Sequence, residues 1–187
     1  MTAADARRAL RSKADPARAR ISHEERLLAL FILTRRFQRG GAAERARIFG
    51  QYLRHRKWIN NWDLVDSSAP YVIGPQLEHG DRHLLYDLAR SRRLWDRRIA
   101  VLATLHFIRQ RDYADAVALC TQLLGDGEDL IHKACGWMLR EIGHRDRRTL
   151  ERFLDRHAAG MPRTMLRDAV ERLPERGRRR YMAAGRR

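Results

Sequence analysis

Lysine and cysteine are scarce in this chain of 187 residues. Among 39 basic residues only Lys13, Lys57 and Lys133 are lysines, so the other 36 are arginines. The two cysteines, Cys120 and Cys135, are too few for a disulfide framework in a chain of this length. Both fall within apolar helical patterns, and we therefore expect buried free thiols.

Long apolar runs are also missing. The longest, residues 27–33 and 99–108, fall short of the roughly 18 residues that a membrane-spanning helix needs. The N-terminus has no apolar core typical of a secretory signal, and no segment alternates as a strand does. There is no glycine-rich phosphate loop and no motif around a nucleophilic serine or cysteine. We expect an all-α cytoplasmic protein that needs no cofactor and has no membrane partner.

The net charge of +16 is concentrated at the two ends of the chain. Residues 1–50 carry a net +7 and residues 151–187 a net +6, whereas residues 101–150 are balanced. A polyanion such as DNA is the natural partner of this charge, because neutralised phosphates supply most non-specific affinity. A basic surface that only keeps the protein soluble fits the charge equally well.

Apolar residues recur at three- and four-residue spacing along most of the chain, which predicts one helix after another. Ser22 and Glu25 form a capping-box pattern at the start of the first. Glycines at 40–41 and 125–127, and Gly160 before a proline, mark breaks between helices. The predicted helices cover residues 22–38, 43–54, 94–109, 113–124, 128–142, 147–157 and 162–173.

A weak repeat of about 35 residues links four of these segments. It aligns Ala100, Ala134 and Ala169, with Ala29 two periods before Ala100. Two helices in such a period are typical of HEAT-like repeats, in which the pairs stack to bury their apolar faces. We therefore expect a curved α-solenoid of antiparallel helix pairs over residues 22–184. An irregular helical bundle is the alternative.

Basic segments flank this predicted domain. Residues 1–21 are rich in alanine and arginine and are expected to form a frayed helix or none. Residues 185–187 end an arginine-rich tail that begins at about residue 176. The tail fits either a phosphate contact or a solvated surface.

Trp137 lies off the apolar face of its predicted helix. The inward face is formed by Ile131, Ala134, Cys135, Met138 and Ile142. Lys133, Arg140 and His144 share the other face with Trp137. A tryptophan among cations suits stacking on a nucleotide or sugar while its neighbours hold phosphates. Packing against a neighbouring repeat explains it equally well.

Trp62 and Asp66 are four residues apart and share a helix face. Asp66 precedes the sequence Ser-Ser-Ala-Pro, so it lies near a helix end. It either caps the next helix or, with Trp62, faces a binding groove.

Arg98 lies near the start of an apolar helix, where a guanidinium and free helix amides together favour a phosphate. An ordinary surface pair with Asp96 is the alternative. His79 and His83 have a spacing compatible with metal ligands, but Gly80 lies between them and no third ligand is near. We expect no metal site.

Four blocks of this sequence resemble the AlkD-like DNA alkylation repair family of HEAT-like DNA glycosylases. They are INNWDLVDSSAP (59–70), LWDRRIAVLATLHFIR (94–109), DLIHKACGWMLRE (129–141) and MPRTMLRDAVERLP (161–174). The resemblance runs from about Ser22 to Tyr181. It implies that Asp66 is the catalytic aspartate, that Trp62 and Trp137 are the groove tryptophans, and that Arg98 contacts DNA.

The resemblance further implies an enzyme that excises cationic bases, N3-alkyladenine and N7-alkylguanine, from double-stranded DNA. Asp66 would stabilise an oxocarbenium-like sugar without a general acid, and Lys133 and Arg140 would add DNA contacts to that of Arg98. We expect it to act as a monomer. Members of the family usually carry more helices before the segment that matches Ser22. This favours, as the alternative, a non-catalytic HEAT-like module that binds DNA or a protein.

Overall fold

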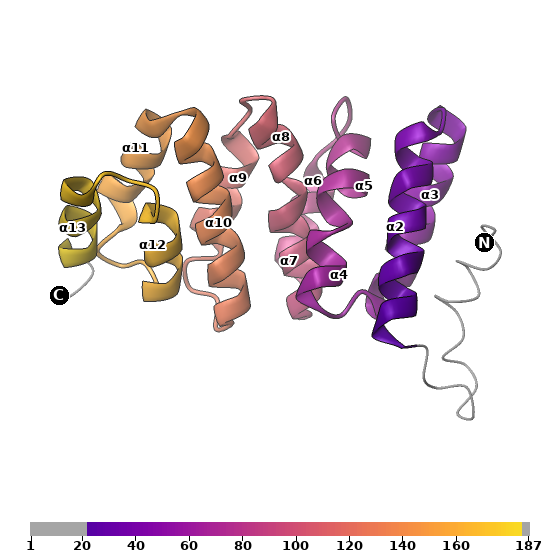
Figure 1. Ribbon diagram of the computed structural model, residues 1–187, viewed down its shortest axis with the longest axis horizontal. Helices are drawn as coiled ribbons and strands as arrows, with labels where there is room; N and C mark the ends of the chain where they lie inside the picture. Colours follow the sequence, from indigo (N-terminus) through magenta and orange to yellow (C-terminus); the bar gives the residue numbers. More distant parts are fainter. Residues whose placement is uncertain (1–21, 185–187) are drawn as a thin grey trace. The chain divides into compact units, whose positions relative to one another are not determined.

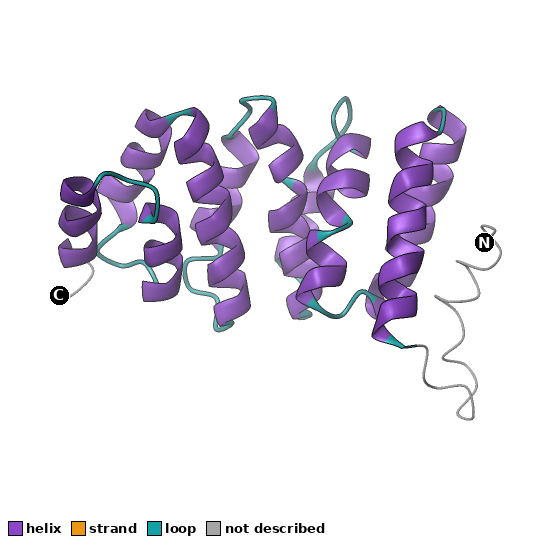
Figure 2. Cartoon of the chain, viewed as in Figure 1, coloured by secondary structure: helices purple, strands orange, loops and turns teal. Residues whose placement is uncertain are grey.

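The computed structural model describes residues 22–184, which form helices, turns and loops without a strand (Figure 2). The all-α class expected from the sequence is therefore confirmed. Residues 1–21 and 185–187, the terminal segments named above, lie outside the described residues. The chain divides into two compact units between Asp81 and Arg82. No described helix is long and apolar enough to cross a membrane.

The first unit is built around α2, which packs against α3, α4 and α5 (Figure 1). Its elements are α2 (His23–Arg39), α3 (Ala42–His55), the 3-10 turn η3 (Arg56–Trp58), α4 (Trp62–Asp66) and α5 (Ala69–Gln76). The predicted capping box is present: the Ser22 hydroxyl accepts from the Glu25 amide, and the Glu25 carboxylate accepts from the Ser22 amide. Gly40 and Gly41 are the cap residues that end α2 and begin α3.

The second unit centres on α10, which contacts α7, α8, α9, α11 and α12. Its helices are α6 (His83–Ala89), α7 (Leu94–Ala103), α8 (Leu105–Arg109), α9 (Ala114–Gln122), α10 (Asp129–Arg145), α11 (Arg147–His157), α12 (Arg163–Val170) and α13 (Glu175–Ala184). The single helix expected over residues 94–109 is interrupted at Thr104, which is buried. Its hydroxyl donates to the Val101 carbonyl at 2.6 Å and so competes with the helix ladder.

The described part of the arginine-rich tail, residues 176–184, is helical, and its arginines are exposed. Tyr181 anchors α13, since its side chain is 3% exposed and its hydroxyl donates to the Asp155 carboxylate of α11 at 2.9 Å. Arg180 pairs with the same carboxylate at 2.7 Å. These contacts, between residues 25 and 26 positions apart, stabilise a helix that its local sequence does not predict.

The residues that align the predicted repeat lie in the hydrophobic core. All four alanines that define it are buried, at 0–1% exposure: Ala29, Ala100, Ala134 and Ala169. Helices also approach closely at Gly136 of α10, where a Cβ would lie 2.7 Å from the Met165 carbonyl oxygen of α12. Small residues therefore set the spacing of α10 and α12. Stacking of the helix pairs into a curved solenoid stays a prediction.

Candidate nucleic-acid interface and catalytic residues

The short helix α4 carries two of the predicted site residues, one at each end. The Asn61 side chain caps its start by accepting from the Trp62 amide at 2.7 Å. Leu64 and Val65, between the two ends, are fully buried and fix the inner side of the helix. Trp62 is 55% exposed, and Asp66, one turn later, is half-buried. The sequence therefore presents an indole and a carboxylate on the outer side of a firmly anchored turn.

Asp66 does not occupy the capping position that the sequence left open for it. Ser68 holds the N-cap position of α5 and is fully buried. Its hydroxyl donates to the Leu64 carbonyl at 2.5 Å and is hydrogen-bonded to the Tyr52 hydroxyl at 2.9 Å. This buried pair secures the turn between α4 and α5 directly behind Asp66. These contacts of Ser68 thus fix the backbone that carries Asp66.

The first turn of α2 holds the segment that leads into α4. His23 Nε2 is hydrogen-bonded to the Asp63 carboxylate, next to Trp62. Arg26 donates to the Trp58 carbonyl at 3.2 Å and to the Asn60 side chain. Sequence reasoning missed both residues, because their partners lie more than thirty residues away. They are positioning residues for the helix that bears Trp62.

Trp137, on α10, is half-buried, and its indole is hydrogen-bonded along the same helix. Its Nε1 donates to a Glu141 carboxylate oxygen at 3.3 Å, and Arg145 pairs with Glu141 at 2.7 Å. Burial opposes ionisation of Glu141, but hydrogen bonds from Arg145 and Trp137 leave its pKa below the usual value. An ionised carboxylate therefore orients the ring near neutral pH.

Lys133 and Arg140, on the same side of α10 as Trp137, both have acidic partners. Lys133 is exposed, with Nζ 3.5 Å from the Asp129 carboxylate. Arg140 pairs with Glu171, just beyond the end of α12. Exposed pairs of this kind contribute little to stability, and a phosphate can replace either carboxylate. This face is therefore balanced in charge, not strongly basic.

Arg98 lies one turn inside α7, which begins at Leu94, and not at the helix start that the sequence suggested. It is 5% exposed, and its guanidinium donates to the Leu130 carbonyl in the first turn of α10 at 2.5 Å. Arg98 is therefore buried, and it lies beyond the first turn of α7. The contact ties α7 to the beginning of α10.

The candidate residues thus form two groups. Trp62 and Asp66 belong to the first unit, and Arg98, Lys133, Trp137 and Arg140 to the second. Within residues 22–184 no three histidine, cysteine, aspartate or glutamate side chains gather as metal ligands. His79 lies in an exposed turn, and His83 begins α6 in the other unit.

Comparison with known proteins gives one match. Residues 5–173 match a family whose description is DNA alkylation repair enzyme. No curated protein and no solved structure matches the chain. The matched range begins before Ser22, where the family resemblance was placed from the sequence, and so includes part of the basic N-terminal segment.

Proposed function

The chain belongs to the DNA alkylation repair enzyme family, and from that premise we propose that it is a DNA glycosylase for cationic alkylated bases in duplex DNA. Alkylation at N3 of adenine or N7 of guanine places a positive charge on the base. Such a base leaves with the electrons of the glycosidic bond and needs no proton from the enzyme. The catalytic demand then falls on the sugar, which becomes an oxocarbenium-like cation.

Asp66 is the residue proposed to meet that demand. A carboxylate near the anomeric carbon stabilises the developing cation and orients the water that attacks it. The observation that carries this proposal is the layout of α4, where the half-buried Asp66 follows the 55% exposed Trp62 by one turn. In this proposal the sugar and base of the bound DNA cover the exposed indole of Trp62 and bring the anomeric carbon to Asp66.

The two tryptophans and the basic residues have supporting roles in this proposal. The faces of Trp62 and Trp137 stabilise a cationic sugar or base by about 0.5–2 kcal/mol each. Lys133 and Arg140 exchange their carboxylate partners for backbone phosphates. Arg98, which holds the start of α10, is proposed to contribute its positive charge to DNA binding.

The test is release of 7-methylguanine from duplex DNA treated with a methylating agent. We expect free base from the wild-type protein and a loss of about 100-fold or more in Asp66→Asn, with DNA binding preserved. Asp87→Asn is the matched control, because Asp87 lies on α6 in an exposed pair with Arg90. Wild-type rates in Asp66→Asn would remove this residue from the mechanism. DNA binding without any base release by the wild type would instead indicate a non-catalytic binding module.

A further inference from the structure

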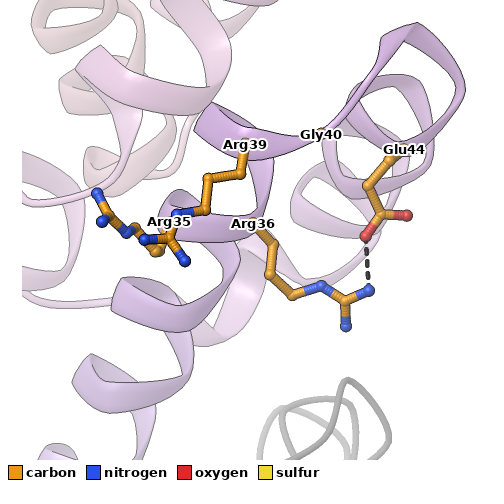
Figure 3. Close-up of a pocket in the computed structure, with 5 residues that line it drawn as sticks. All are labelled: Arg35, Arg36, Arg39, Gly40 and Glu44. Atoms are coloured by element: carbon orange, nitrogen blue, oxygen red, sulfur yellow. Dashed lines mark ion pairs between the residues drawn. The ribbon is translucent and has the colours of Figure 1, made fainter.

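Three arginines line a hollow at the end of α2. Arg35, Arg36 and Arg39 project from its last turns, and Gly40 and Glu44 complete the lining of this open, shallow hollow of about 300 Å³ (Figure 3). All five residues belong to α2, α3 and the turn between them, within the first unit. None of them is among the residues assigned above to base excision.

Among residues 22–184, an acidic partner is found for one of these three arginines. Arg36 pairs with Glu44 at 2.8 Å, as Figure 3 shows, and Arg47 shares that carboxylate at 2.6 Å. The hydrogen bond from Arg47 is the main reason that the pKa of Glu44 lies below its usual value. Arg36 and Arg47 therefore share one ionised carboxylate, while Arg35 and Arg39 add two further positive charges to the lining.

Arg35 and Arg39 both line the hollow, and in Figure 3 they extend away from the Arg36–Glu44 pair. Within residues 22–184 neither has a hydrogen bond or an ion pair. Like charges four residues apart on a helix repel each other, and the negative end of the α2 dipole offsets this only in part. The pair is therefore poised to take up an anion.

Gly40 keeps the hollow open between the helices. A Cβ at this position would lie 2.8 Å from Cγ of Glu44 and 2.9 Å from the Arg36 carbonyl oxygen. Any side chain would push Glu44 away or fill the space between α2 and α3. The turn therefore brings the arginines and Glu44 together around an unfilled space.

We propose that this hollow binds a phosphodiester group of the nucleic-acid backbone. The planar guanidinium fork matches phosphate oxygens and is charged at every working pH. Contacts of arginine with phosphate position DNA without reading its sequence. Phe31, one turn before Arg35, is 49% exposed and supplies an apolar surface for a deoxyribose. The proposal extends the proposed function by giving its DNA partner a contact away from α4.

The experiment is the salt dependence of binding to undamaged duplex DNA. We expect Arg35→Gln with Arg39→Gln to reduce the slope of log affinity against log salt by about 1 to 2, since each phosphate contact contributes about 0.9. Arg152→Gln with Arg156→Gln is the matched control, an exposed pair at the same spacing on α11. Glu44→Gln should act in the opposite direction, because it frees two arginines and steepens the slope.

The outcomes separate this proposal from the glycosylase proposal. A reduced slope in Arg35→Gln/Arg39→Gln alone, with unchanged excision at saturating DNA, supports the contact. If the wild type releases no base but the slope still falls, the contact stands and the glycosylase proposal fails. An unchanged slope, or an equal fall in the α11 control, overturns the contact. A third result would also overturn the contact: the double variant alone loses tight binding of inorganic phosphate, but its DNA binding is unchanged.

Discussion

His23, the first residue of α2, is hydrogen-bonded through Nε2 to the carboxylate of Asp63, which lies forty residues later and next to Trp62. The two side chains are 30% and 25% exposed, so water screens the contact only in part. Together with the two hydrogen bonds from Arg26 to Trp58 and Asn60, this contact links α2 to α4 and to the segment that precedes it. A helix of five residues depends on such tertiary support, because it is too short to be stable alone.

We predict that His23→Ala lowers base release while the fold survives. Loss of one such hydrogen bond costs about 1 kcal/mol, which the domain tolerates, but it loosens the segment that places Trp62 and Asp66. Thermal unfolding and the single-turnover rate of 7-methylguanine release measure the two effects. His79→Ala, an exposed histidine of the same unit, should change neither. Equal rates in His23→Ala and wild type would contradict a positioning role.

Arg98→Ala should weaken DNA binding, flatten its salt dependence and also destabilise the protein. The half-buried Leu130 carbonyl loses its donor and a packed side chain is removed, so we expect a cost of about 2 kcal/mol. Chemical unfolding and DNA titrations at several salt concentrations separate the two effects. Arg92→Ala, an exposed arginine before α7, is the control. A destabilised variant with an unchanged salt slope would leave Arg98 a structural role alone.

Local patterns in the sequence predicted most of the fold. The Ser22–Glu25 capping box, the glycine turn at 40–41 and the register of the buried alanines are properties of short segments, and all are present. The family and the all-α class followed from the same segments. Each of these features depends on residues that are close together in the sequence.

The sequence failed where distant contacts decide the outcome. No local pattern in the arginine-rich end of the chain predicted that Tyr181 packs against α11 or that Arg180 pairs with Asp155. Arg98 follows two charged residues and reads as exposed, but the approach of α10 buries it. The exposed Trp62 was identified as a site residue, whereas its support from His23 was not. No local rule links residues that only the fold brings together.

The raised pKa of Tyr86 predicts that the protein loses stability at high pH. Burial first, and then a hydrogen bond to Asp115 at 2.7 Å, raise its pKa to about 12. The folded chain therefore holds this proton more tightly than the unfolded chain, whose tyrosines titrate near 10. The stabilisation is complete below pH about 10 and is lost as the pH rises towards about 12.

Denaturant unfolding between pH 8 and 12 tests this, and Tyr86→Phe should remove that part of the pH dependence. Tyr113→Phe is the control, because its buried hydroxyl has no hydrogen-bond partner in the described part of the chain. The same decline in Tyr86→Phe as in wild type would assign the loss to other groups.

Substitution of Trp137 tests whether the candidate residues of the second unit contact DNA. If its ring stacks on a sugar or base, Trp137→Leu should lower base release by about 2- to 30-fold, the equivalent of 0.5–2 kcal/mol, and Trp137→Phe should lose less. Glu141→Gln should behave as a mild form of the same change, because it removes the charge that holds both Arg145 and the indole Nε1. If Trp137 instead only packs within its unit, Trp137→Leu should lower the unfolding temperature and leave the rate at saturating DNA unchanged. Trp95→Leu, a half-buried tryptophan on α7, shows how much of any effect comes from packing alone.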